Sequence, residues 1–164
     1  MGRYYVMDRD KRWERIQIAF EGLIDGKGEE TSEDKVVELV ASRYVSKEDP
    51  QTDEFLKPII VNRNGLIKEN DTLVFINYRS DRVRQITETL GIKMNFESAT
   101  KVPANLKLYT MTQYKKEFPF AILYPPVVPK NVLAEAISNC KLTQYHVAET
   151  EKYAHVMYLF KFLF

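Results

Sequence analysis

Two arginines lie where an apolar run gives way to a polar turn, at Arg79 and Arg82 in the stretch VFINYRSDRVRQIT. The run 73–76 predicts a buried strand of a parallel sheet. In open α/β sheets, ligands bind outside the carboxyl ends of the strands. A guanidinium group donates paired hydrogen bonds to a phosphate or carboxylate and keeps its charge. The junction between this strand and the helix that follows is therefore a candidate ligand site.

A plainer interpretation is open for the same turn. Asp81 can pair with Arg82 or Arg84 at a solvated helix start, and surface ion pairs of this kind contribute little to stability. Ser80 or Asp81 is the expected N-cap, and the apolar spacing that follows predicts a helix up to Gly91. If that helix begins at its cap, the two arginines lie about one turn apart and face one pocket.

The composition describes an ordinary globular protein. Of 164 residues, 45% are hydrophobic and 29% are charged, which is enough for one domain with a core. The net charge of +1, from 24 basic and 23 acidic side chains, disfavours a nucleic-acid binder. The single cysteine, Cys140, cannot form an internal disulfide and fits a reducing compartment. No signal-peptide pattern and no bilayer-spanning segment is found, so we expect a cytoplasmic protein that binds no membrane.

The periodicity along the chain predicts an α/β fold with a mostly parallel sheet flanked by helices. Tyr114 is expected to be packed rather than to line a cleft, and the prolines between 119 and 129 are expected to form a stiff linker without regular structure. The remaining expected elements are a strand in 1–7, a helix from Trp13 to Gly26, a helix over 36–43, a hairpin of strands 59–61 and 66–67 across Asn64-Gly65, a strand in 105–112, a helix over 129–139, a strand over 142–147 and a helix over 149–160.

Several long segments resemble one enzyme family in the family's order. The stretch at Arg79 is similar to the motif FFNFRPDRxRQ of the cofactor-independent phosphoglycerate mutases, and the start, GRYYVMDRDKRWERIQIAF, resembles their segment GRYYAMDRDKRWERxxxAY. TDEFLKP, MTQYKKEFPF and AETEKYAHV follow in the same order. The resemblance covers almost the whole chain except its last eight residues, which depart from the family pattern.

The resemblance implies a role for five residues. In the family, arginines at the positions of Arg3, Arg9, Arg79 and Arg82 hold the phosphate and carboxylate of phosphoglycerate, and a lysine at the position of Lys152 reaches the transferred phosphate. It also implies the substrate-binding insert domain of an alkaline-phosphatase-like enzyme over 1–124, incomplete at its start. Residues 125–164 would then be a linker and the first elements of the phosphatase-like catalytic domain.

The same resemblance implies an incomplete catalytic apparatus. The family uses two manganese ions and a nucleophilic serine, which lie outside the segments that this sequence matches. His146, His155 and Cys140 show no metal-ligand spacing, and His155 is expected to be structural. We therefore expect that this chain alone does not interconvert 3-phosphoglycerate and 2-phosphoglycerate, although it belongs with a glycolytic isomerase.

Three interpretations of the chain stay open. It can be a fragment of a phosphoglycerate mutase that keeps the arginine clamp for the small-molecule substrate. It can be one subunit of a split enzyme, with a companion chain carrying the serine and the metal ligands. It can also be a non-catalytic module that binds or senses a phosphometabolite. The sequence does not distinguish them, and it does not give the oligomeric state.

Overall fold

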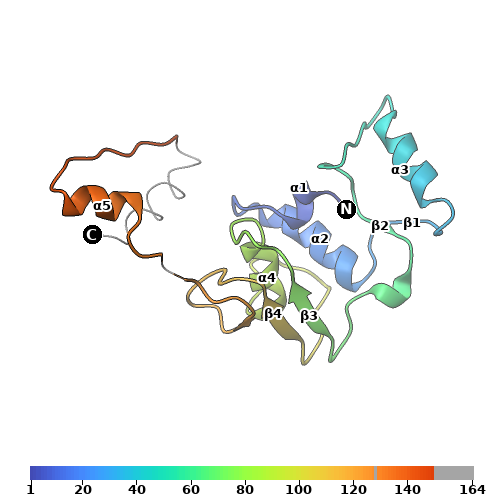
Figure 1. Ribbon diagram of the computed structural model, residues 1–164. Helices are drawn as coiled ribbons and strands as arrows, with labels where there is room; N and C mark the ends of the chain where they lie inside the picture. The colour runs from blue at the N-terminus through green and yellow to red at the C-terminus, as the bar shows by residue number, and fades with distance from the viewer. Residues whose placement is uncertain (128, 150–164) are drawn as a thin grey trace. The chain divides into compact units, whose positions relative to one another are not determined.

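A computed structural model describes residues 1–127 and 129–149, which fall into two compact units, Met1–Pro125 and Pro126–Phe164 (Figure 1). The described part contains no helix that is long and apolar enough to cross a membrane. The first unit contains α1 (Arg3–Val6), α2 (Trp13–Ile24), β1 (Glu29–Glu30), α3 (Val36–Tyr44), β2 (Ile59–Ile60), the 3-10 turn η1 (Arg63–Gly65), β3 (Thr72–Phe75), α4 (Arg84–Gly91), β4 (Lys107–Thr110) and β5 (Ala121–Ile122), and the second contains α5 (Leu133–Asn139).

All described strand pairs are parallel. Strands β3, β4 and β5 form a sheet in that order, and β1 pairs with β2 in a second, two-stranded sheet. In the larger sheet Leu73 lies opposite Leu108, and Thr110 lies opposite Ile122. The predicted α/β class with a parallel sheet and flanking helices is therefore confirmed.

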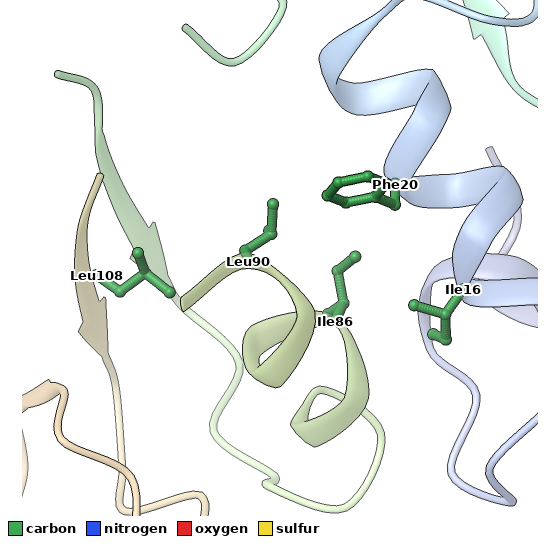
Figure 2. Close-up of a cluster of buried hydrophobic side chains, with 5 residues drawn as sticks. All are labelled: Ile16, Phe20, Ile86, Leu90 and Leu108. Atoms are coloured by element: carbon green, nitrogen blue, oxygen red, sulfur yellow. The ribbon is translucent and has the colours of Figure 1, made fainter. Parts of the chain in front are cut away.

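Helix α4 joins the sheet to helix α2 through a small apolar core. Ile86 and Leu90 of α4 face Ile16 and Phe20 of α2, and Leu108 of β4 completes the cluster (Figure 2). All five side chains are buried. Burying each one stabilises the fold by about 1.5–3 kcal/mol relative to an exposed side chain. The helical spacing predicts both helices, and α4 ends at Gly91 as expected, although it begins later than its expected N-cap.

Gly91 closes the contact between α4 and the sheet. A Cβ at this position would lie 2.4 Å from the Phe120 ring and 2.7 Å from a methyl group of Leu108. A side chain at this position would force Phe120 or Leu108 to shift, so glycine allows the end of α4 to lie close to β4.

Four predicted elements are wrong. In each case the structure depends on whether the segment contacts another part of the chain. Residues 1–7 contain the short helix α1, because Gly2 and Tyr4 donate backbone hydrogen bonds to the segment near Glu54. The hairpin is absent, since β2 pairs in parallel with β1 and the Asn62 side chain accepts a bond from the Asn64 N–H, which favours a 3-10 turn. Strand β5 lies inside the proline-rich stretch that was expected to lack regular structure.

The fourth error lies in the second unit. Residues 142–147 are not a strand in the described structure, and the side chains of Leu142, Tyr145 and Val147 are largely exposed. An apolar alternation forms a strand only when a neighbouring strand pairs with it. The helix predicted over 149–160 lies almost entirely outside the described residues.

Glu21 of α2 ties the helix to the loop that precedes β4. Its carboxylate accepts hydrogen bonds from the Ser98 hydroxyl at 2.6 Å and from Gln17 Nε2 at 3.0 Å, and Lys27 Nζ lies 2.9 Å away. The Ser98 bond, then the Gln17 and Lys27 bonds, outweigh burial and lower the pKa of Glu21 from 4.5 to about 2. The ionised carboxylate therefore stabilises the folded state.

We expect the free energy of unfolding to fall as the pH drops from about 4.5 toward 2, because the folded-state pKa of Glu21 lies below its unfolded value. Glu21→Gln should lower the free energy of unfolding at pH 7 and reduce its further decrease between pH 4.5 and 2. Thermal melts followed by circular dichroism between pH 2 and 7 measure both effects. The exposed Glu33 provides the control, because Glu33→Gln should not change the decrease in the free energy of unfolding at low pH. An unchanged pH profile in Glu21→Gln would contradict the assignment.

Candidate functional site

Asp81 brings together two segments that are far apart in the sequence. Its Oδ2 atom accepts a hydrogen bond from Arg9 Nη1 at 3.2 Å and another from Arg79 Nη2 at 3.1 Å. The Asp81 side chain is 19% exposed, that of Arg9 is 26% exposed and that of Arg79 is 69% exposed. The plainer interpretation is wrong about the partners Arg82 and Arg84, although Asp81 does form ion pairs at this turn. We call this arrangement the Asp81 bridge.

The charges in the Asp81 bridge fix its protonation state. Burial raises the pKa of the Asp81 carboxyl, but the hydrogen bond from Arg9 and the charges of Arg79 and Arg9 outweigh it, and the pKa falls below its usual value. The carboxylate is thus ionised at neutral pH and holds two guanidinium groups beside each other. Two cations gathered at one partly open position can attract an anion with more than one acceptor oxygen.

Arg82 contacts the same N-terminal segment by another route. Its Nη1 atom donates a hydrogen bond to the backbone oxygen of Met7 at 3.1 Å. Helix α4 begins only at Arg84, and neither Ser80 nor Asp81 caps it. Arg79 and Arg82 therefore lie in the turn before the helix, and the expected spacing of one helical turn is wrong. Contacts with residues 7–9 bring them to the same region instead.

The loop that carries Arg9 is held from within by Asp8, which is only 3% exposed. Asp8 Oδ2 accepts hydrogen bonds from the backbone N–H groups of Asp10 at 3.0 Å and Arg12 at 2.9 Å. Lys11 adopts a left-handed conformation with φ of 61°. Its N–H donates to Gln85 Oε1 of α4 at 3.1 Å, so the loop is fastened to the helix that follows the Arg79 turn.

Two further arginines lie apart from the Asp81 bridge. The side chain of Arg15 is 17% exposed, lies 3.7 Å from the Tyr4 ring centre and pairs with Asp8 at 3.7 Å. Arg3 is 53% exposed and pairs with Glu54 at 3.0 Å. The described contacts thus join Arg9, Arg79 and Arg82 into one region, whereas Arg3 makes its ion pair elsewhere.

Tyr114 contacts the residues on both sides of the turn that contains Arg79. It is 2% exposed, and its hydroxyl donates to the backbone oxygen of Asn77 at 2.8 Å, with the backbone oxygen of Phe75 also within reach at 3.2 Å. Its own backbone oxygen accepts from Arg84 Nε at 2.7 Å. The expectation of a packed tyrosine is confirmed, because this side chain holds the end of β3 against the start of α4.

A pocket of about 440 Å³ opens beside the Asp81 bridge. Its walls include Arg9 and Asp81 of the bridge, Trp13, and the Lys115–Glu88 ion pair, whose atoms are 2.9 Å apart. Gln85 also lines it, and among the described residues its Nε2 donor is buried without a hydrogen-bond partner. The pocket lining carries more positive than negative side chains, which suits an anionic ligand.

Two predicted features of the site are Lys152 and a metal centre. Lys152 lies outside the described residues. Across residues 1–127 and 129–149, no group of three or more His, Cys, Asp and Glu side chains is placed to hold a metal ion. These residues do not fit the two manganese ions that the resemblance implies, so no chemical step of this chain is derived through a metal.

The comparisons with known proteins agree with the resemblance. A family model described as the N-terminus of the BPG-independent phosphoglycerate mutases matches residues 1–116. The chain is 52% identical over 162 residues to the 2,3-bisphosphoglycerate-independent phosphoglycerate mutase of Brugia malayi, covering 98% of this chain and 31% of the relative. For the Caenorhabditis elegans protein of the same name, the identity is 51%, over 98% of this chain and 30% of the relative. The chain thus spans about a third of the length of the curated relatives it matches.

A solved structure with a similar fold belongs to Leishmania mexicana phosphoglycerate mutase, crystallised at low cobalt concentration. The TM-score is 0.68 with 24% sequence identity, over 97% of this chain and 30% of that one. At this identity the likeness supports the fold alone.

We expect Asp81→Asn to lower the free energy of unfolding at pH 7 by about 1–3 kcal/mol, because it removes a charge-assisted hydrogen bond from each of two arginines. Urea titration followed by circular dichroism measures the change. Asp49, in an exposed pair with Lys57, is the matched control, and Asp49→Asn should leave the urea midpoint unchanged. Equal effects of the two substitutions would show that the Asp81 bridge is only a surface contact.

Proposed function

The chain belongs to the family of 2,3-bisphosphoglycerate-independent phosphoglycerate mutases, and from this premise we propose that it binds phosphoglycerate for the interconversion of the 3-phospho and 2-phospho isomers. The Asp81 bridge is the observation that carries this proposal. It supports the proposal because one carboxylate joins the guanidinium groups of Arg9 and Arg79 from two distant segments, and Arg9 and Asp81 also line the pocket.

Phosphoglycerate suits such a site because it carries a phosphate dianion and a carboxylate a few bonds apart. Arginine forks match the oxygen geometry of both groups, and they stay charged at any physiological pH. Asp81 keeps Arg9 and Arg79 together against their mutual repulsion, and Arg82 is held nearby by the Met7 carbonyl. A bound anion then receives hydrogen bonds from side chains that are already ordered, which lowers the entropy lost on binding.

The other proposed contacts come from the family resemblance. Arg3 would reach the substrate after leaving its exposed pair with Glu54, and Lys152 would contact the transferred phosphate. We propose that residues 1–124 form the substrate-binding domain and that residues 125–164 begin the phosphatase-like domain. This chain contributes binding and orientation, and the phosphoryl transfer requires groups from the rest of the relatives' length.

The clamp predicts a binding defect that depends on the guanidinium fork. Arg79→Ala or Arg82→Ala should weaken binding of 3-phosphoglycerate about 10- to 150-fold, the equivalent of one charge-assisted hydrogen bond. Lysine at either position should restore binding only in part. Titration calorimetry on the chain measures this. Kinetics of a hybrid in which this sequence replaces the matched stretch of the Brugia malayi relative provide a second measurement.

The control for this experiment is Arg63→Ala, since Arg63 is an exposed arginine that pairs with Glu30 away from the Asp81 bridge. It should bind 3-phosphoglycerate as the unmodified chain does. If Arg79→Ala leaves both the dissociation constant and the hybrid's KM and kcat unchanged, the clamp is not formed by this residue.

A separate prediction distinguishes a binding chain from a complete enzyme. The purified chain should show no mutase activity with 3-phosphoglycerate, with or without added Mn²⁺ or Co²⁺, while the hybrid should be active. A coupled assay for 2-phosphoglycerate measures both. Activity of the chain that survives repeated purification and is lost in Arg79→Ala would show that the chain is catalytically complete. Binding without any role in the hybrid would favour a non-catalytic phosphometabolite module.

A further inference from the structure

Three consecutive backbone N–H groups in the loop between α1 and α2 are bonded in two directions. Those of Asp10 and Arg12 donate to the Asp8 carboxylate inside the loop. The N–H of Lys11, which lies between them, donates to Gln85 Oε1 of α4 at 3.1 Å. Asp8 therefore sets the shape of the loop from within. The Gln85 bond joins the loop to another element, so it sets where the loop lies relative to α4.

The bond to α4 is made at a strained point of the backbone. Lys11 has a φ of 61°, in the left-handed region that residues with a side chain rarely adopt. Such a conformation persists only where surrounding contacts hold it. Lys11 itself is exposed, so hydrogen bonds of the loop backbone provide these contacts and side-chain packing does not. Arg9 lies two residues away, so its guanidinium group moves with the loop when the bond to Gln85 is lost.

Gln85 makes this bond at a cost to the fold. It is 6% exposed, and its Nε2 donor is buried without a hydrogen-bond partner among the described residues. A buried donor that makes no hydrogen bond destabilises a protein. An apolar side chain would fill the same space without that cost, but it could not accept a bond from the Lys11 N–H. The amide therefore contributes to the position of the loop more than to stability.

Two other bonds join the same loop to the turn before α4, and both come from arginines of the proposed clamp. Arg9 donates to Asp81 at 3.2 Å. Arg82 donates to the backbone oxygen of Met7 at 3.1 Å. The phosphate and carboxylate oxygens of a bound phosphoglycerate compete for these guanidinium N–H groups. The bond to Gln85 uses neither arginine, so it stays in place when the arginines bond to the ligand.

We propose that Gln85 is a positioning residue for substrate binding, which keeps Arg9 within reach of the ligand by holding the Arg9 loop against α4. The inference rests on the function proposed above. Gln85 touches no substrate and acts through Arg9. The effect of such a residue disappears when the residue that it positions is removed, whereas a general loss of stability keeps its effect in either background.

The test is a double-mutant cycle on the binding of 3-phosphoglycerate, measured by titration calorimetry on the chain. Gln85→Met removes the acceptor and keeps the length of the side chain. It should weaken binding about 3- to 10-fold, the equivalent of one neutral hydrogen bond. In the Arg9→Ala background it should change binding by less than about twofold, whereas in the Arg79→Ala background it should keep its full effect. The kcat/KM of the hybrid enzyme gives the same cycle by a second measurement.

Thr87→Val is the matched control on the same helix. The Thr87 hydroxyl is buried and donates to the backbone oxygen of Val83 within α4 at 2.6 Å, so the substitution weakens α4 without changing the bond to the loop. It should leave the dissociation constant unchanged even where it lowers the urea midpoint. Circular dichroism confirms that each variant is folded. If Gln85→Met does not fold, Gln85→Asn takes its place, because it keeps the amide but withdraws the acceptor on a shorter side chain.

Amide hydrogen exchange in the absence of ligand measures the bond itself. Exchange at Lys11 should become about threefold faster or more in Gln85→Met, since its N–H loses an acceptor. It should stay slow in Gln85→Glu, which keeps an acceptor oxygen, and in Thr87→Val.

Three results would overturn the inference alone. The first is binding that weakens less than about threefold in Gln85→Met while Arg9→Ala weakens it about tenfold or more. The second is an equal effect of Gln85→Met with and without Arg9. The third is a loss of binding in Thr87→Val equal to that in Gln85→Met. An unchanged dissociation constant in both Arg9→Ala and Arg79→Ala is a different result, because it contradicts the proposed function and removes the inference with it.

Discussion

The packing of helix α4 between strand β4 and helix α2 is the contact on which the rest of the first unit depends. Ile86 and Leu90 can bury their side chains against Ile16 and Phe20 only if α4 lies across α2. Gly91 sets how closely the end of α4 approaches the sheet. Once α4 is fixed, the turn before it must pass beside the loop that follows α1, because Gln85 and Arg82 bond to that loop's backbone.

Two carboxylates then fix the positions of the arginines in the segments that this packing brings together. Arginines brought close together repel one another, and the Asp81 carboxylate offsets that repulsion by accepting from both Arg9 and Arg79. Asp8 acts in a comparable way on the backbone, since it orders the loop that carries Arg9. An apolar core thus determines where the segments meet, and two carboxylates determine how their cations are presented.

The sequence by itself determined the family, the α/β class, and helices α2 and α4. These features depend on local spacing and on long motifs, which a single chain displays directly. Only the tertiary structure decided that Asp81 pairs with Arg9 and not with Arg82, that Arg15 is packed on Tyr4, and that residues 1–7 are helical. Each of these depends on partners distant in the sequence, and local pattern contains no information on which distant groups a fold brings within hydrogen-bonding reach.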